Sequence, residues 1–410
     1  MRRRAFIAGL GSAAVWPMGQ RYAQAAIVRP DVANLPPYGN STLPPGIRSR
    51  IVNDINGLAM HVLEAGFEPK GRACILLLHG FPEIAYSWRK IMLPLAEVGY
   101  YVIAPDQRGF GRTTGWDDAY DGDVYSFRRF NLVRDALGLV AAVGYRSVAA
   151  VVGHDHGMPN AALCALLRPD VFRSAVLMSA AFGGPPQIPF NTAEFPQTRL
   201  SNAFEDLAKL HPPKRFYQDY YRTREAAEDM NNAPQGIHNF LRAYYHCKSA
   251  DRKENKPSRL ASFTATELLK IPSYYIMDID KGIAETLASY MPSPGQIAAC
   301  KWLTDSELDV YAAEFGRTGF QGALNWYRIM VGKYAAELEI LSGRTIDVPT
   351  CFIAGATDWV PYFRPGAIET LETSVSTQWR GTHFVDGAGH WVQQEQPEQV
   401  SRLILQFLRS

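Results

Sequence analysis

Short apolar runs alternate along the chain with segments whose apolar positions recur at helical spacing. The runs that have the length of buried strands are 73–78, 101–104, 148–152 and 175–178. The segments with helical spacing between them are 87–98, 127–143 and 158–167. Strands that are apolar throughout and separated by helices indicate a parallel sheet covered on both faces. We therefore predict an α/β fold with a mostly parallel sheet.

This alternation stops near Gly183 and resumes close to the C-terminus with two strand patterns at 348–354 and 379–385, followed by a helical pattern at 398–408. The interval of about 160 residues holds aromatic helical segments and no good strand pattern. We expect a split core with an inserted all-helical cap. The predicted divisions are core 26–182, cap 183–345 and core 346–410.

The N-terminus has the pattern of an export signal. Basic residues at 2–4 precede an apolar stretch to Trp16, and Ala23-Gln24-Ala25 offers a small-residue cleavage site. Residues 3–7 resemble a twin-arginine signal, the type that exports folded proteins. We predict a signal peptide at 1–25 and a periplasmic or secreted protein, the alternative being a frayed basic terminus. Removal of its four arginines would change the net charge from +2 to −2.

Composition narrows the function classes. With 47% hydrophobic and 20% charged residues, the chain is globular, and its charge of +2 is far from that of a nucleic-acid binder. No apolar run reaches the length of a membrane-spanning helix. The five cysteines form no CxxC pair, which argues against a zinc ribbon or a disulfide framework. An enzyme or a small-molecule binding protein remains.

Residues 151–158 (VVGHDHGM) are the most informative stretch of the chain. A buried strand runs through Gly-x-x-x-Gly directly into a helix, a pattern that places the middle residue on a sharp turn above the sheet. Asp155 occupies that position. A carboxylate nucleophile can open a strained or activated alkyl carbon and form an alkyl-enzyme ester. The alternative is an aspartate that merely caps the following helix.

Two further residues supply what hydrolysis of such an ester needs. Asp358 follows the strand at 348–354, and His390 follows the last strand after two glycines. In this chain order an acid fixes the imidazole tautomer and the histidine takes a proton from water. Separately, either could be an ordinary turn aspartate or loop histidine. Together, at strand ends, they predict a triad with Asp155.

His154 and His156 could also be interpreted as metal ligands, because His-x-His at a strand end can bind zinc. A zinc site needs three or four convergent ligands. His79 could approach, but no further pair has suitable spacing. We therefore expect no metal and no cofactor.

Four motifs together resemble the signature set of epoxide hydrolases with the α/β-hydrolase fold: residues 79–83 (HGFPE), 106–111 (DQRGFG), 153–157 (GHDHG) and 389–391 (GHW). The resemblance runs from about residue 50 to the C-terminus. It implies an epoxide and water as substrates, and an oxyanion hole formed by the backbone N–H groups of Phe81 and His156. It also implies substrate contacts in the matching segments from His79, Pro82, Trp326 and Trp391.

The predicted cap carries two segments that resemble those of the same family. Residues 319–328 place Tyr327, and residues 215–221 place Tyr217, at the positions of its two cap tyrosines. Two phenols above the nucleophile could hydrogen-bond the epoxide oxygen and supply a proton. Tyr220 and Tyr221 lie beside Tyr217, so that assignment has neighbouring alternatives. The segment at 253–292 makes the cap longer than in compact relatives.

One departure from the family pattern bears on the reaction. His156 stands where the family usually has Trp. Haloalkane dehalogenases resemble this group but hold the departing halide with that Trp, and fluoroacetate dehalogenases carry Arg there, so His156 counts against both. A haloalkane or haloacid dehalogenase with the same nucleophile stays the first alternative. A non-catalytic receptor on the same fold is the second, although a receptor does not need the triad.

Overall fold

The structure is a computed structural model of the chain, and it describes residues 30–68, 71–186 and 202–410. The predicted signal peptide at 1–25 lies outside the described residues. Within the described ranges, no helix has the length and apolar character needed to cross a bilayer.

An eight-stranded sheet forms the core, in the order β1-β2-β4-β3-β5-β6-β9-β10. Its parallel part runs from β4 to β10, and β2 joins β4 antiparallel. The strands are β1 (Ile47–Ile55), β2 (Leu58–Ala65), β3 (Cys74–Leu78), β4 (Tyr101–Pro105), β5 (Ala150–His154), β6 (Ala175–Met178), β9 (Thr350–Gly355) and β10 (Trp379–Val385). The mostly parallel sheet predicted from the apolar runs is confirmed.

The antiparallel hairpin of β1 and β2 was not among the predicted strands. Its two-residue turn is Asn56-Gly57, where both residues have positive φ. Asn-Gly is a strong hairpin signal because both residues tolerate that conformation. β1 lies at the sheet edge and carries exposed polar residues, so it has no continuous apolar run to reveal it.

Helices cover the sheet. The α2 helix packs against α16 and α17, and α3 packs against α4. The core helices are α1 (Pro30–Ala33), α2 (Arg89–Glu97), α3 (Arg129–Ala142), α4 (Gly157–Leu167), α15 (Ala367–Thr370), α16 (Val392–Glu395) and α17 (Pro397–Arg409), with short turns η1 (Ala85–Trp88), η2 (Tyr125–Phe127), η4 (Val360–Tyr362) and η5 (Leu371–Val375). The helical spacing in the sequence thus predicted both ends of α2, α3, α4 and α17 to within two residues of their observed bounds.

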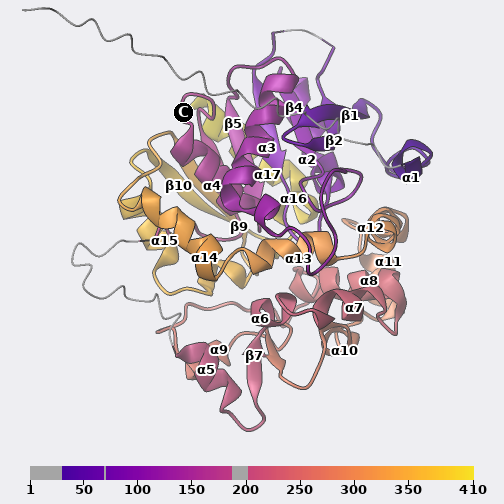
Figure 1. Cartoon of the computed structure of the whole chain (residues 1–410), viewed down its shortest axis with the longest axis vertical. Helices are drawn as coiled ribbons and strands as arrows, with labels where there is room; N and C mark the ends of the chain where they lie inside the picture. Colours follow the sequence, from indigo (N-terminus) through magenta and orange to yellow (C-terminus); the bar gives the residue numbers. More distant parts are fainter. Residues whose placement is uncertain (1–29, 69–70, 187–201) are drawn as a thin grey trace, which may run out of the picture.

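Between β6 and β9 the chain builds a helical cap, which lies below the core in Figure 1. Its helices are α5 (Ala203–Ala208), α6 (Tyr217–Tyr221), α7 (Glu225–Asn231), α8 (Gly236–Lys248), α9 (Ala265–Leu268), α10 (Ile283–Ala288), α11 (Pro294–Ala299), α12 (Asp305–Thr318), α13 (Gln321–Arg328) and α14 (Gly332–Ala336), followed by the turn η3 (Glu337–Leu341). A short antiparallel ribbon of β7 (Lys214–Phe216) and β8 (Ile276–Asp278) joins them. The prediction of an all-helical cap is therefore wrong at this ribbon, because strands of three residues leave no readable alternation in the sequence.

Buried polar contacts fasten the cap to the core. Trp326 Nε1 donates a hydrogen bond of 2.8 Å to the Arg108 carbonyl. Arg89 and Glu307 form an ion pair of 2.8 Å. These contacts join α13 and α12 of the cap to core segments beside the carboxyl edge of the sheet, where the candidate site lies.

Candidate active site

Asp155 directly follows β5 on the sharp turn that the sequence predicts. Its φ is +49°, a left-handed conformation that costs a non-glycine residue energy and occurs most often at functional sites. The glycine two positions later permits the turn, because a Cβ on Gly157 would come within 2.2 Å of the Leu78 carbonyl oxygen. The α4 helix therefore begins pressed against the end of β3, with Asp155 above the sheet.

The two oxygens of Asp155 have different partners. Oδ1 accepts a hydrogen bond of 2.9 Å from the backbone N–H of Phe81, next to a cis Phe81–Pro82 peptide bond. Oδ2 lies 3.5 Å from Nε2 of His390. One oxygen is thus held by a backbone donor, and the other faces the histidine.

His390 is held in place from its other side. Its Nδ1 lies 3.1 Å from Oδ2 of Asp358 and 2.9 Å from the hydroxyl of Ser179. Ser179 donates a bond of 2.6 Å to the same Asp358 oxygen. All three side chains are buried. Asp155, His390 and Asp358, predicted from separate strand ends, therefore converge in one chain of contacts, and Ser179 joins them.

Contacts among Asp155, His390 and Asp358 shift the pKa values of Asp155 and His390 in opposite directions. Burial alone would raise the pKa of Asp155, but the contact with His390 and the nearby histidines hold that pKa well below its usual range. Burial alone would lower the pKa of His390, but the charge of Asp358 and the contacts with both carboxylates raise it to about 9. The resting site therefore contains an aspartate anion beside an imidazolium.

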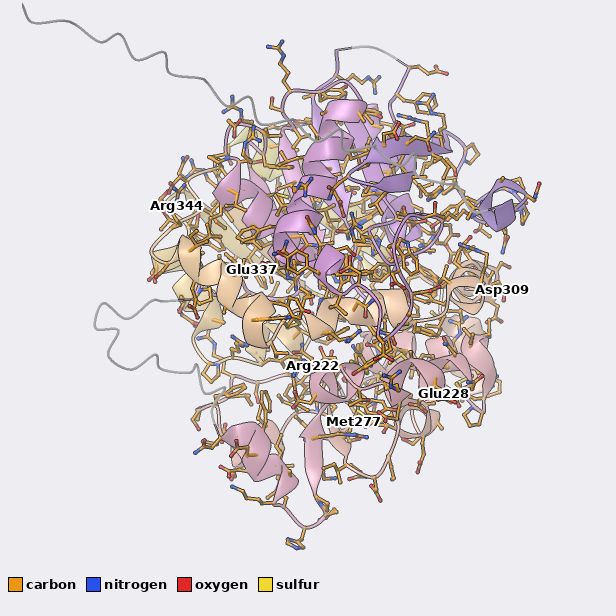
Figure 2. The ribbon with its side chains drawn as sticks, in the orientation of Figure 1. Arg222, Glu228, Met277, Asp309, Glu337 and Arg344 are labelled. Carbon is orange, nitrogen blue, oxygen red and sulfur yellow. The ribbon has the colours of Figure 1, made fainter. Side chains whose placement is uncertain are left out.

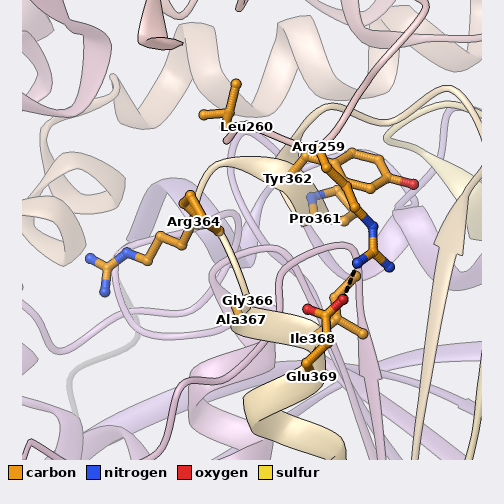
Figure 3. A pocket seen from close by; sticks show the side chains of 10 residues that line it. Arg259, Leu260, Pro361, Tyr362, Arg364, Gly366, Ala367, Ile368 and Glu369 are labelled. Atoms are coloured by element: carbon orange, nitrogen blue, oxygen red, sulfur yellow. Dashed lines mark hydrogen bonds and ion pairs between the residues drawn. The ribbon is translucent and has the colours of Figure 1, made fainter. Parts of the chain in front are cut away.

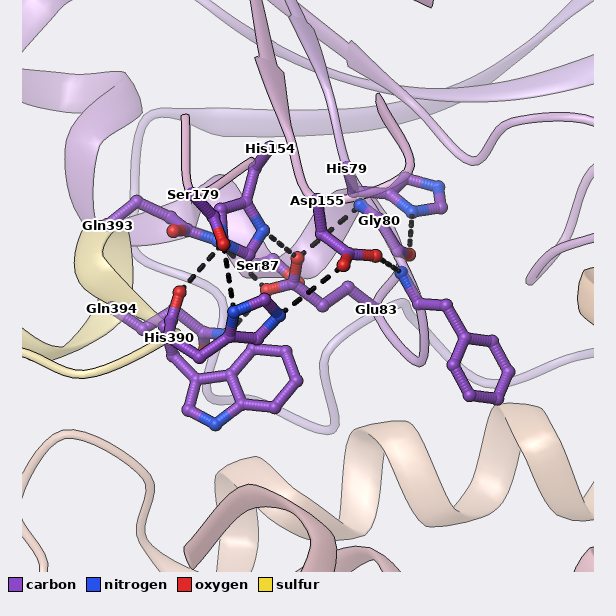
Figure 4. A network of polar contacts seen from close by, with 12 residues as sticks. His79, Gly80, Glu83, Ser87, His154, Asp155, Ser179, His390, Gln393 and Gln394 are labelled. Carbon is purple, nitrogen blue, oxygen red and sulfur yellow. Dashed lines mark hydrogen bonds and ion pairs between the residues drawn. The ribbon is translucent and has the colours of Figure 1, made fainter. Parts of the chain in front are cut away.

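A second buried network adjoins the first, and Figure 4 shows it beside Asp155 and His390. Glu83 accepts hydrogen bonds from His154 at 2.7 Å and from the side-chain amides of Gln393 and Gln394. His154 in turn contacts the His390 carbonyl at 2.8 Å. Glu83 thereby ties the loop after β3 to the residues that flank both Asp155 and His390.

Tyr217 and Tyr327 come from two different cap helices, α6 and α13, and meet edge to face with ring centroids 6.2 Å apart. The Tyr327 ring also lies 4.2 Å from the ring of His156, the residue after Asp155. Arg222, labelled in Figure 2, donates to the Tyr327 carbonyl and joins the two helices. Burial raises the pKa of both phenols, and the charge of Asp155 raises both further, so both are proton donors at neutral pH.

The alpha/beta hydrolase fold family matches residues 74–397. Epoxide hydrolase A of Mycobacterium tuberculosis is 33% identical over 87% of this chain and 95% of its own length. An epoxide hydrolase of Caballeronia sordidicola is 28% identical over 87% of this chain and 92% of its length. The chain belongs to the epoxide hydrolases of the alpha/beta hydrolase fold.

Solved structures agree with this membership. An epoxide hydrolase from an endophytic Streptomyces superposes with a TM-score of 0.69, at 29% identity over 89% of this chain and 96% of that one. Potato (Solanum tuberosum) epoxide hydrolase I superposes with a TM-score of 0.68, at 30% identity over 88% of this chain and 99% of that one. The likeness therefore includes the cap as well as the core.

The four residues expected to contact substrate have polar atoms that the protein itself occupies. His79 contacts the Gly80 carbonyl through Nδ1 and the Gln107 backbone N–H through Nε2, so it braces the loop instead of offering a hydrogen bond to substrate. The indole nitrogens of Trp326 and Trp391 donate to backbone carbonyls, and the Pro82 carbonyl accepts from Tyr245. All four residues are buried, so their expected contacts with substrate stay a prediction.

The side chain of His156 is buried beside the Tyr327 ring. The Nδ1 atom of its buried ring has no hydrogen-bond partner among the described residues. Burial lowers its pKa to about 4 despite the opposing charge of Asp155, so the ring is neutral at neutral pH. The oxyanion role expected of its backbone N–H stays a prediction.

His79, His154 and His156 do not point toward a common position, as the ligands of a zinc site would have to. Both ring nitrogens of His154 contact protein groups, Glu83 and the His390 carbonyl. Across the part of the chain that the structure describes, no group of three His, Cys, Asp or Glu side chains could hold a metal ion. The Gly-x-x-x-Gly turn accounts for the arrangement instead.

The cap segment at 253–292 contributes to a surface hollow that lies apart from Asp155 (Figure 3). Arg259 and Leu260 form one wall, and residues 361–369 of the core form the other. An Arg259–Glu369 ion pair spans it. None of the predicted site residues lines this hollow, so it is separate from the triad.

Sequence analysis did not identify two residues of the site, Ser179 and Glu83. Ser179 has φ of +70° directly after β6 and would have been detectable only as a polar residue at the carboxyl end of a predicted strand. Glu83 lies within a quoted motif, but its buried network draws on residues more than 300 positions away. Spacing in sequence carries no sign of such a partnership.

Proposed function

We propose that this protein hydrolyses an epoxide to a vicinal diol in two steps, through an ester on Asp155. The observation that carries the proposal is that Asp155 contacts both the Phe81 N–H and His390 at once. The nucleophile, the base and one oxyanion donor are thus assembled around a single carboxylate. Phenols that remain protonated complete the set.

In the first step, Oδ2 of Asp155 attacks an epoxide carbon and the C–O bond of the ring breaks. Tyr217 and Tyr327 hydrogen-bond the departing oxygen, and one of them gives it a proton. The raised pKa of each phenol keeps that proton available at neutral pH. The product is a neutral ester that carries the new hydroxyl group.

Formation of the ester prepares the second step. Once Asp155 is alkylated, its negative charge no longer raises the pKa of His390, so the imidazolium becomes more acidic and can give up its proton. His390 then takes a proton from water, which attacks the ester carbonyl. The Phe81 N–H stabilises the resulting oxyanion, while Asp358 and Ser179 hold the ring.

The test is diol formation from styrene oxide and an aliphatic epoxide, with halide release from matched halogenated substrates measured in parallel. We expect diol formation that is lost in Asp155→Ala, and an added mass equal to the substrate on His390→Gln. In a single turnover in ¹⁸O-water, the label should enter Asp155 rather than the diol. Halide release without diol would instead identify a dehalogenase, and ligand binding without turnover a receptor.

We also propose that residues 1–25 direct export of the folded protein by the twin-arginine route to a periplasmic or secreted location. The Arg3-Arg4 pair and the small-residue site at 23–25 support this. All five cysteines are free thiols, and four of them are buried, as befits a protein that folds before it meets an oxidising compartment. The test is cell fractionation of the full chain against Arg3→Lys/Arg4→Lys, which should remain in the cytoplasm.

A further inference from the structure

Lys248 is a buried cation at the boundary between cap and triad. It ends helix α8 and is only 6% exposed. Its carbonyl accepts a hydrogen bond of 2.9 Å from the backbone N–H of His390, and a Cβ on Gly389 would lie 2.4 Å from the same carbonyl oxygen. The end of α8 is therefore pressed onto the loop that carries the catalytic histidine.

The ammonium of Lys248 is enclosed by tyrosines. Nζ donates a hydrogen bond of 2.9 Å to the Tyr244 hydroxyl. It lies 4.3 Å from the ring centroid of Tyr244, 4.7 Å from that of Tyr275 and 5.5 Å from that of Tyr217. Aromatic faces attract cations, and the attraction is strongest where water is excluded. One of these three rings belongs to a proposed proton donor.

No carboxylate pairs with this ammonium in the described part of the chain, although a buried lysine normally has such a partner. The negative charges of Asp155 and Asp358 act on it from a greater distance and favour its charged form. The buried carboxylates of Asp155 and Asp358 thus act on Lys248 from a distance, and its ammonium is tied to neither of them.

We propose that Lys248 is a positioning residue for ring opening, whose ammonium stabilises the negative charge that Tyr217 acquires as it protonates the epoxide oxygen. This inference rests on the proposed function. It follows from the direction in which charge moves, from Asp155 in the core to a phenol in the cap, over whose ring the ammonium already lies. A phenolate ring attracts a cation more strongly than a phenol does, so the interaction grows during the step.

The step balances without another reactant. The Asp155 oxygen forms a bond to carbon, the ring C–O bond breaks, and the electron pair on oxygen takes the phenol proton of Tyr217. The phenolate that remains is neutralised by Lys248. Before hydrolysis the His390 imidazolium gives up its proton, which reaches the phenolate through solvent. Neutral His390 then takes one proton from water as the hydroxide attacks the ester carbonyl, and the second proton of that water ends on the diol oxygen as the ester bond breaks. Asp155 is left as the anion and His390 as the imidazolium, so the resting charges are restored.

The experiment measures single-turnover ring opening with 1,2-epoxybutane and its 4,4,4-trifluoro analogue, which is similar in shape but opens to a less basic alkoxide. The charge-removing variants are Lys248→Met and Lys248→Gln, and Lys248→Arg retains the charge. Lys333→Met is the matched control, because Lys333 is exposed and also lies over a tyrosine ring, that of Tyr334 at 5.1 Å.

We expect Lys248→Met and Lys248→Gln to open the hydrocarbon epoxide about tenfold more slowly than the wild type. The trifluoro epoxide should be slowed much less, because its oxygen needs less protonation. Lys248→Arg should restore most of the rate and Lys333→Met should leave it unchanged. Equal slowing of both epoxides would assign Lys248 a merely structural role, and no slowing would remove it from the reaction.

A pH profile of the wild type and Lys248→Arg keeps the test available if the uncharged variants do not fold. The groups around Nζ are Asp155, Asp358, Cys247 and the tyrosines 217, 244 and 275. Burial lowers the pKa of Lys248 to about 8. Ring opening by the wild type should become slower above that pH while Lys248→Arg keeps its rate, and coincident profiles would overturn the proposal.

A wild type that forms no diol would count against the proposed function, whereas an active wild type with unaffected variants would count against Lys248 alone.

Discussion

Nε2 of His390 lies 3.5 Å from Oδ2 of Asp155, so the proposed general base and the proposed nucleophile form an ion pair before substrate arrives. Replacing Asp155 with Asn keeps the shape of the side chain and removes its charge, as esterification does. We expect the pKa of His390 to fall below its value of about 9. NMR titration of the His390 ring measures this, with the exposed Asp309→Asn as control. An unchanged titration would contradict the proposed switch from acid to base.

The same ion pair predicts how stability depends on pH. Because the folded-state pKa of His390 is raised from 6.5 to about 9, the folded protein holds this proton more tightly than the unfolded chain. The stabilisation is fully present below pH 6.5 and is lost as pH rises to 9. Urea unfolding across this range should show the wild type losing free energy of unfolding that His390→Gln does not lose. If the free energies of unfolding of the two proteins change with pH in parallel, the folded protein does not hold the His390 proton more tightly than the unfolded chain.

The two cap phenols should act on ring opening alone. Tyr217→Phe and Tyr327→Phe each remove one donor to the developing alkoxide, and removal of one such donor costs about 10²–10³ in rate. Pre-steady-state kinetics separates formation of the ester from its hydrolysis. Tyr221→Phe is the matched control, since Tyr221 packs against both rings yet bonds Tyr244. If Tyr221→Phe were as slow as the other two, general packing would explain the loss.

Ser179 should matter for the second step. Its hydroxyl bonds Asp358 and contacts His390, and a hydrogen bond to a charged group is worth about 1.5–3 kcal/mol. Ser179→Ala should slow ester hydrolysis by tenfold or more and let the ester accumulate, as mass spectrometry would detect. Ser174→Ala is the control, because Ser174 bonds only a backbone carbonyl near the opposite end of β6. Equal ester levels in the two variants would exclude this role.

The turn that carries Asp155 should tolerate no side chain at Gly157. In Gly157→Ala the new methyl group would meet the carbonyl oxygens of Leu78 and His79 at 2.2 and 2.5 Å, both of them backbone atoms that cannot rotate away. We expect a loss of about 3 kcal/mol or more in the free energy of unfolding. Gly295→Ala, in helix α11 with open space around it, should be neutral or slightly stabilising.

The sequence was informative where local pattern decides structure. Buried strands such as β3 and β6 are apolar throughout because helices cover both faces of the sheet, and the turn at 153–157 needs glycines for reasons visible in a few residues. The hairpin of β1 and β2 was not predicted because β1, an edge strand, has no apolar run, and His61 and Glu64 interrupt the apolar run of β2. The ribbon of β7 and β8 is too short to show a period.

Contacts between distant segments could not be predicted in the same way. Asp358 and His390 were placed because each follows a strand, and parallel strands bring their carboxyl ends together. Ser179 also follows a strand, but nothing local shows that it contacts the other two, and Glu83 and Lys248 satisfy no local rule. Ser179 depends on a partner 179 positions later, and Lys248 depends on three rings that only the folded cap assembles.

The placement of the cap between β6 and β9 also sets the order in which the protein can become complete during synthesis. β6 pairs with β9, yet about 170 residues separate them, so the ribosome needs about 10–35 seconds to make the missing neighbour. Throughout that time the apolar edge of β6 is open to pairing with other chains. The nascent chain also carries Asp155 without His390, so an ester formed at that stage would lack the base that hydrolyses it. The growing chain is therefore open to aggregation for as long as β9 is missing, however stable the finished fold is.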